Sequence, residues 1–163
     1  MRKELPQELL RQLLKNSKRS DRDLAKILKV SQPTITRTRH KLEKSGMIQD
    51  YTIIPDFRKM GFEILALTFV KMHPGILTPE TMDEARKYAR TFSNAVFAST
   101  GEGLGMTGVI ISFHKDYTDY HSKLNLLRVD WKEFTEDIQS FVVSLKEGEI
   151  KRFSLTHLKD VPL

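Results

Sequence analysis

The segment from Ser20 to Gly46 limits the fold of this chain more than any other part of the sequence. Ser20 is placed as the N-cap of a helix, and Asp23, three residues later, completes a capping-box-like pair. Ser31 is placed as the N-cap of a second helix with Pro33 in its first turn, and Gly46 follows as a helix stop. The segment therefore predicts two short helices joined by a tight turn.

Apolar residues recur with helical spacing in this segment and in the stretch before it. Residues 6–16 predict a helix with a leucine stripe, and Pro6 fits an early helical position where its missing N–H costs nothing. Three helices are therefore expected to enclose a small core. Its expected members are Leu9, Leu10, Leu13, Leu14, Leu24, Ile27, Leu28, Ile35 and Leu42.

The second capped helix has an outer face that suits the major groove of DNA. With about 100° of rotation per residue and Ile35 facing inward, small hydroxyl residues lie at the N-terminal end of this face and cations lie further along. Short side chains allow close approach, Arg37 can reach base edges or phosphates, and lysines bind phosphates. The expected DNA-binding residues are Gln32, Pro33, Thr34, Thr36, Arg37, His40, Lys41 and Lys44, with Arg22 at the start of the preceding helix. Arg39 lies only about 40° from Ile35, so its stem is expected to pack inward while its charged head reaches solvent.

The distribution of charge supports a polyanionic partner for the N-terminal part only. The chain has a net charge of +6. Residues 1–60 hold 15 Lys and Arg against 7 Asp and Glu, a net of +8, whereas residues 61–163 hold 12 against 14, a net of −2. RNA or a membrane surface would satisfy this charge equally well, and a three-helix bundle with a solvated basic face remains the plainer alternative.

The second half predicts a different architecture. Strands are expected at 63–72, 94–100, 105–114, 138–145 and 150–158, and helices at 78–92 and 116–134. This β-α-β-β-α-β order with an added C-terminal strand is typical of a ferredoxin-like domain. We therefore expect an α+β fold with two domains, a helix-turn-helix in 1–60 and a ferredoxin-like domain in 61–163. The β-branched run at 47–55 predicts a short β-wing, and the double-faced apolar strand at 63–72 predicts that two sheets pack together in a dimer.

Several chemistries are disfavoured by the sequence. No cysteine is present, so disulfides and thiolate chemistry are excluded. The loop G-E-G-L-G joins two strands, which suits a flexible β-connection better than a nucleotide site. His114, Asp116, Asp119 and His121 are metal-capable but lack ligand spacing. No catalytic motif, metal or cofactor is expected.

The polar N-terminus and the absence of a spanning apolar run predict a cytoplasmic protein without a membrane partner.

Residues 9–62 resemble the DNA-binding half of the Lrp/AsnC family of leucine-responsive, feast/famine transcriptional regulators. The matching signals are L-A-K in the first capped helix, S-Q-P-T-I-T-R in the second, the exit L-E-K-S-G-M-I-Q-D-Y and the later M-G-F. The resemblance implies a winged helix-turn-helix followed by a RAM/ACT-like domain that forms dimers and higher oligomers and often binds amino acids. Thr38 and Arg39 depart from the family pattern, which usually has a basic and then an apolar residue.

The resemblance implies a sequence-specific transcription regulator that binds double-stranded DNA as a homodimer or a higher homo-oligomer. It places contacts to an amino-acid effector in Gly101, Glu102, Gly103, Leu104, Gly105 and Met106. The loop lacks the aspartate of the family's G-x-x-D pattern, and Glu102 is an imperfect substitute, so effector binding is expected to be altered or absent. Two rivals stay open: a weakly specific architectural DNA-binding protein without a ligand, and a small-molecule-binding ferredoxin-like protein whose basic part is incidental.

Overall fold

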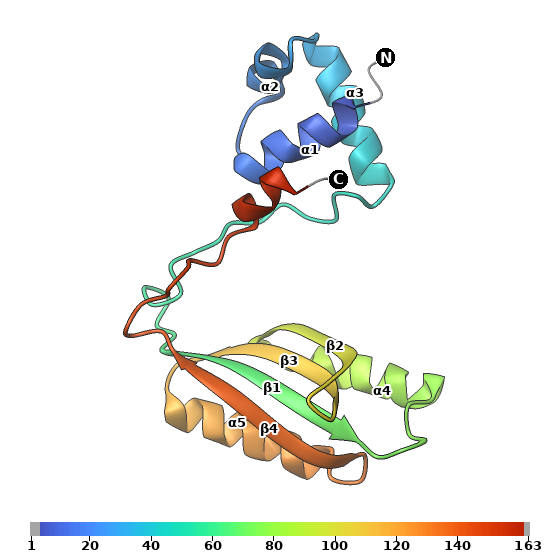
Figure 1. The fold of residues 1–163 in the computed structure, drawn as a ribbon, viewed down its shortest axis with the longest axis vertical. Helices are drawn as coiled ribbons and strands as arrows, with labels where there is room; N and C mark the ends of the chain where they lie inside the picture. The colour runs from blue at the N-terminus through green and yellow to red at the C-terminus, as the bar shows by residue number, and fades with distance from the viewer. Residues whose placement is uncertain (1–3, 162–163) are drawn as a thin grey trace. The chain divides into compact units, whose positions relative to one another are not determined.

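The computed structural model describes residues 4–161, which form two compact units. Of the described residues, the first unit contains 4–54 and 151–161, and the second contains 55–150. The chain therefore passes between the units twice, as Figure 1 shows. Within the described residues no helix has the length and apolar character needed to cross a membrane. The sequence had suggested one division near residue 60 and had not placed the C-terminal segment with the first unit.

The first unit contains three helices, α1 (Leu5–Lys15), α2 (Asp21–Leu28) and α3 (Gln32–Lys44). The predicted caps are confirmed: the hydroxyl of Ser20 accepts a hydrogen bond from the amide of Asp23 at 3.2 Å, and that of Ser31 accepts one from the amide of Thr34 at 3.4 Å. Lys29 ends α2 in the left-handed conformation with φ of 53°. The predicted helix-turn-helix is thus present, and its turn depends on a non-glycine residue at positive φ.

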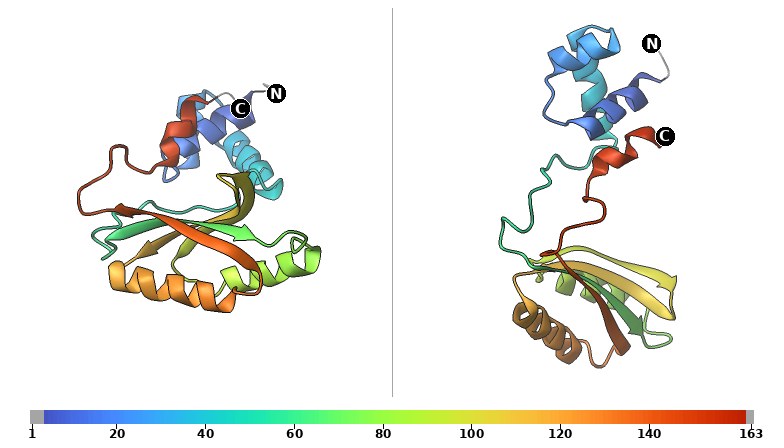
Figure 2. Two further views of the ribbon diagram at one scale, coloured as in Figure 1. Left: turned by 60° about the horizontal axis from the view of Figure 1, so that its bottom comes forward. Right: turned by 60° about the vertical axis from the view of Figure 1, so that its left-hand side comes forward.

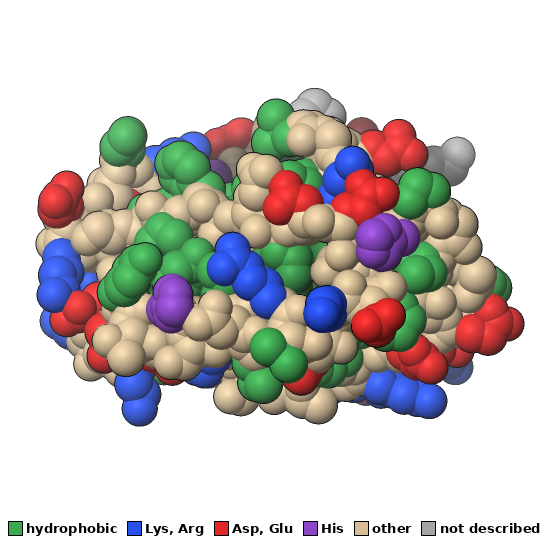
Figure 3. All heavy atoms as spheres, turned by 90° about the horizontal axis from the view of Figure 1, so that it is seen from below, with side chains coloured by type: hydrophobic (Ala, Val, Ile, Leu, Met, Phe, Trp, Pro, Cys, Tyr) green, Lys and Arg blue, Asp and Glu red, His purple; other side chains and the backbone are tan. Residues whose placement is uncertain are grey.

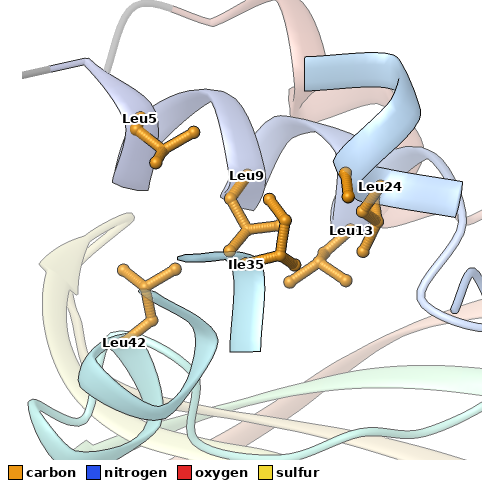
Figure 4. Packing of buried hydrophobic residues seen from close by; sticks show 7 residues of the cluster. Leu5, Leu9, Leu13, Leu24, Ile35 and Leu42 are labelled. Carbon is orange, nitrogen blue, oxygen red and sulfur yellow. The ribbon is translucent and has the colours of Figure 1, made fainter. Parts of the chain in front are cut away.

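Leucine and isoleucine side chains from all three helices form the core of this unit (Figure 4). Leu9, Leu24 and Ile35 are fully buried. The prediction for Ile27 was wrong, since its side chain is 44% exposed. The buried arc of α2 is centred between Leu24 and Ala25, and Ile27 lies about 110° from that centre at 100° per residue.

The second unit is a four-stranded antiparallel sheet with two helices on one face (Figure 2). Its elements are β1 (Ile64–Met72), α4 (Pro79–Ala89), β2 (Ala95–Gly103), β3 (Met106–His114), α5 (Tyr117–Asp130) and β4 (Thr135–Ser144). The sheet order β2-β3-β1-β4 is that of a ferredoxin-like domain, so the predicted α+β fold is confirmed. Ile64 and Ala66 of β1 pack under Tyr120 and Leu124 of α5.

The opposite face of the sheet carries an apolar row across all four strands. Leu67 of β1 is directly paired with Ile111 of β3 and with Phe141 of β4, and Ile111 is paired with Phe97 of β2. Direct partners in antiparallel strands point to the same face. Neither helix of the unit covers this face (Figure 2).

The predicted β-wing is absent. Residues 47–55 contain no strand, and within the described chain no second strand pairs with them. The side chain of Tyr51 instead joins this run to α3: its hydroxyl donates to Glu43 Oε1 at 2.9 Å and accepts from Arg39 Nη1 at 3.1 Å. A β-branched run forms a strand only beside a partner strand, and side-chain contacts hold this one without a ladder.

The predicted additional C-terminal strand is also absent. Gly148 turns the chain at φ of 86°, and residues Leu155–Asp160 form a short 3₁₀ helix, η1. Ser154 caps η1, and the hydroxyl of Thr156 donates to the carbonyl of Leu14 at 3.2 Å. That carbonyl lies in the last turn of α1, where backbone acceptors have no partner within the helix. The segment therefore completes the end of α1 rather than extending the sheet.

Candidate nucleic-acid interface

The residues predicted to contact DNA gather on the solvent face of α3. Seven of them are exposed on this helix and Thr34 is half-buried, while Arg22 is exposed at the start of α2. The exposed members on α3 are Gln32, Pro33, Thr36, Arg37, His40, Lys41 and Lys44. The helix thus presents short residues in its first turns and long cations further along.

Three of these cations have no protein partner. In the part of the chain that the structure describes, the side chains of Arg37, Lys41 and Lys44 form neither hydrogen bonds nor ion pairs. His40 differs, because its Nδ1 lies 3.2 Å from Glu43 Oε2. A phosphate or base edge could therefore bind the three cations without displacing an internal contact.

A group of polar side chains ties α3 to the start of α2, and we call Asp21, Thr36, Arg39 and Tyr51 the Asp21 clamp. Asp21 Oδ1 accepts from Arg39 Nε at 2.8 Å, and Asp21 Oδ2 accepts from the hydroxyl of Thr36 at 2.7 Å. Arg39 Nη2 also lies 2.8 Å from Asp21 Oδ1. Burial opposes ionisation of Asp21, but hydrogen bonds from Thr36 and Arg39 and the charge of Arg39 outweigh it and lower the pKa of the carboxyl.

The Asp21 clamp gives the charge of Arg39 a partner, and it gives Thr36 an internal hydrogen bond in place of the predicted contact to DNA. The head of Arg39 is ion-paired rather than solvated, so the expectation of a snorkelling side chain was wrong in this respect. The hydroxyl of Thr36 is bonded to Asp21, and that of Thr34 lies 2.7 Å from Ser31 Oγ. These threonine hydroxyls are therefore bonded within the first unit, whereas the side chains of Arg37 and Gln32 are exposed.

Sequence reasoning missed Asp21 and Tyr51. Asp21 lies in the first turn of α2, where an acidic residue suits the helix dipole, so its presence there points to no other partner. The unexplained charge of Arg39 near an inner face was the signal that a buried counter-charge was needed. Tyr51 gave no such signal, since its segment was interpreted as a strand.

The difference in net charge between the two units of the structure is greater than the difference between residues 1–60 and 61–163. Residues 1–54 and 151–163 hold 16 Lys and Arg against 7 Asp and Glu, a net of +9, and residues 55–150 hold 11 against 14, a net of −3. Figure 3 shows both signs of charge interspersed on the face of the molecule seen from below in Figure 1. A polyanion is therefore expected to bind the first unit.

The predicted effector residues form a tight hairpin rather than a flexible connection. Gly103 pairs with Met106, and Leu104 and Gly105 between them have φ of 53° and 72°. Two positive φ values define a type I′ turn, which rarely carries leucine because its Cβ is crowded in that conformation. Leu104 is also 84% exposed. These residues belong to the second unit and not to the DNA-binding face.

The metal-capable residues separate into structural roles. Asp116 caps α5 by accepting from the amide of Asp119 at 2.7 Å, and His121 is exposed. His114 is buried, with Nε2 at 2.8 Å from Ser112 Oγ and Nδ1 at 3.6 Å from Asp119. Burial lowers the pKa of His114, and the charge of Lys123 acts in the same direction while Asp119 opposes both.

Comparisons with known proteins agree with this arrangement. A family model described as MarR family matches residues 8–53, which is under a third of the chain. The Uncharacterized HTH-type transcriptional regulator PH0061 of Pyrococcus horikoshii is 28% identical over 143 residues, covering 87% of this chain and 83% of that protein. The crystal structure of PH0061 matches with a TM-score of 0.77 at 25% identity and covers 94% of this chain and 99% of that one.

Two further structures show the same fold. B. subtilis LrpC matches with a TM-score of 0.71 at 19% identity, covering 90% of this chain and 96% of that one. The Transcriptional Regulator NMB0573/L-Met Complex from Neisseria meningitidis matches with a TM-score of 0.75 at 16% identity, covering 97% of this chain and 99% of that one.

The chain has the fold of the Lrp/AsnC-type structures that it matches. The resemblance drawn from its helix-turn-helix motifs is confirmed over nearly the whole length, beyond the short MarR match. Its relatives are helix-turn-helix transcriptional regulators rather than enzymes, and at this coarse level the chain is similar to transcriptional regulators.

Proposed function

We propose that the chain is a sequence-specific DNA-binding transcription regulator that acts in the cytoplasm as a homodimer or larger homo-oligomer. One observation carries the proposal: α3 presents three unpartnered cations, Arg37, Lys41 and Lys44, while the Asp21 clamp fixes the helix from its inner side. A helix held in this way enters the major groove with little loss of conformational freedom.

The roles on α3 follow from reach and position. Gln32 and Arg37 lie in the first half of the helix, where recognition helices contact base edges, and an amide and a guanidinium pair with adenine and guanine respectively. Lys41 and Lys44 lie further along and bind phosphates. Arg22 and the first amides of α2 bind the neighbouring backbone, since a helix N-terminus attracts anions.

The partner of the second unit is a second copy of this chain. The row of Phe97, Ile111, Leu67 and Phe141 spans the uncovered sheet face, and Phe141 is 66% exposed. Packing two such faces together buries these side chains. The two recognition helices would then contact half-sites about 34 Å apart, or a multiple of that spacing.

An amino acid is the effector that we propose for the hairpin at Gly101–Met106. The support is the family fold together with the L-methionine named for the NMB0573 complex. Glu102 is exposed on this hairpin and keeps a carboxylate in the loop, although it is longer than aspartate. Binding of amino acids, tested by calorimetry with L-methionine first, should disappear in Glu102→Ala if the hairpin is the site.

Selection from random DNA tests the main proposal. Repeated gel-shift selection with the full chain, with and without added amino acids, should enrich a short sequence in two copies. A pool that stays random after repeated rounds would overturn sequence-specific binding.

The second candidate function is that of a weakly specific architectural DNA-binding protein, and the internal hydrogen bonds of Thr34 and Thr36 favour it. Because Thr34 and Thr36 are committed to internal hydrogen bonds, few side chains remain to read bases. This candidate predicts similar affinity for unrelated duplexes and a steep dependence on salt.

A further inference from the structure

An apolar cavity of about 170 Å³ lies in the second unit between α4 and the sheet. Its walls come from Met82, Ala85 and Ala89 of α4, Val70 of β1, and Leu127 near the end of α5. Trp131, which follows α5, closes one end. Exposed Ala98 on the edge strand β2 also lines the cavity, so it opens to solvent at the edge of the sheet.

The helix above this cavity is not packed onto the sheet. All residues of α4 are described, and none of them is buried. By contrast, α5 buries Tyr120 and Leu124 against the same sheet. Protein interiors are normally close-packed, so space of this size under one helix of a pair is unusual.

Aromatic rings form one wall. Tyr88 lies 5.4 Å from Trp131 and 4.8 Å from Phe92 between ring centroids, in tilted and edge-on arrangements. All three residues line the cavity. Ring edges and faces presented in this way bind another aromatic ring favourably.

The polar groups around the cavity are already paired. The hydroxyl of Tyr88 donates to Asp130 Oδ2 at 2.6 Å, Thr107 bonds the backbone of Met72 and Val70, and Thr135 donates to the carbonyl of Trp131 at 2.9 Å. Arg86 at the wall is ion-paired with Asp83. No buried polar side-chain atom in the described residues lacks a partner, so a charged or strongly polar guest would gain nothing there.

We propose that this cavity is a binding site for a small uncharged aromatic molecule. An apolar cavity of about 150 Å³ lined by aliphatic and aromatic side chains binds benzene, so the volume fits one ring with one or two substituents. The site lies between α4 and the sheet, inside one chain, and none of its lining residues belongs to the hairpin at Gly101–Met106 to which we assign the effector, although Thr100 and Thr107 flank that hairpin. It therefore does not depend on the oligomer or on DNA.

Trp131 provides a direct readout, because it is the single tryptophan and is buried at the end of the cavity. Titration of the full chain with toluene should change Trp131 emission and shift the methyl resonances of Ala85 and Ala89, with a dissociation constant of about 1 mM or tighter. Benzylammonium, which has the same ring and a positive charge, should bind at least about 10-fold more weakly. No change up to the solubility limit of toluene, or equal binding of both probes, would overturn the site.

A cavity-filling variant separates the site from nonspecific partitioning. Ala85→Leu should reduce toluene binding at least about 10-fold and raise the melting temperature, because its side chain occupies the space. Lys87→Leu introduces the same residue on the exposed side of α4, and binding there should match the unmodified chain. Toluene binding that survives Ala85→Leu would contradict the proposal, and if that variant does not fold the titration of the unmodified chain still decides the matter.

Discussion

At the scale of single residues, the proposed DNA-binding face of α3 depends on the two carboxylate oxygens of Asp21. One oxygen holds Arg39 and the other holds Thr36, so a single charge on α2 positions two residues of α3. The side chains left over, above all Arg37, are those that face solvent. The carboxylate is therefore a positioning group rather than a contact to DNA.

Removal of this carboxylate should loosen the first unit in a pH-dependent way. Asp21→Ala should lower its unfolding free energy by about 1–2 kcal/mol near neutral pH, measured by amide hydrogen exchange at Leu24 and Ile35. The pKa of Asp21 is lowered from its ordinary 3.8, so its contribution is complete above that pH and is lost as the pH falls through the folded-state pKa. The difference between the two chains should therefore vanish in strong acid. Asp160→Ala, an exposed control in the same unit, should leave exchange unchanged.

The buried His114 makes the second unit sensitive to mild acid. Its pKa is lowered from the ordinary 6.5, so the unfolded chain takes up a proton before the folded chain does. The contribution of His114 to the unfolding free energy of the second unit should be fully present above about pH 6.5. Below that pH the unfolding free energy should decrease by at most about 1.4 kcal/mol per pH unit.

Denaturant unfolding followed by Trp131 emission measures this effect in the second unit. His114→Gln should flatten the fall between pH 6.5 and the folded-state pKa, whereas His121→Gln, on the exposed side of α5, should keep it. An unchanged slope in His114→Gln would show that another group is responsible.

At the scale of elements, the turn of the β2–β3 hairpin holds Leu104 in a backbone conformation that leucine rarely adopts. Leu104 occupies a left-handed position that asparagine or glycine usually fills. Leu104→Asn should raise the unfolding free energy of the second unit by about 0.5–1 kcal/mol, again measured by Trp131 emission. A loss of stability would mean that the exposed leucine makes contacts in the assembled protein that outweigh the backbone strain.

The elements also show which parts of the fold the sequence determines locally. Ser20 and Ser31 cap their helices through bonds to residues three positions away, so these helix starts could be predicted. The wing at 47–55 and the strand at 150–158 could not be decided from the pattern, because a strand exists only with a neighbour that the pattern does not identify. The clamp between Asp21 and Arg39 joins residues 18 apart, and only their positions on α2 and α3 in space bring them together.

At the scale of the whole molecule, the proposed function requires that two copies of the chain pack together through their uncovered sheet faces. Phe141→Lys should halve the mass of the proposed dimer measured by light scattering, because it buries a charge at the β4 end of the apolar row. Tyr117→Lys is a matched control, since Tyr117 is 64% exposed but lies on α5 on the opposite face of the sheet. If Tyr117→Lys dissociates the dimer and Phe141→Lys does not, the two copies contact each other through the helices instead.

The central claim is that the solvent face of α3 binds DNA, and the affinity of a double variant tests it most directly. Dissociation constants for the selected duplex should be measured at several salt concentrations for the unmodified chain and for Arg37→Ala combined with Lys41→Ala. The account predicts an affinity loss of about 100-fold and a salt dependence weaker by about one to two phosphate contacts. Lys87→Ala combined with Lys132→Ala, which removes the same charge from the second unit, should bind as the unmodified chain does. Equal affinity of the Arg37 and Lys41 double variant and the unmodified chain would contradict the account.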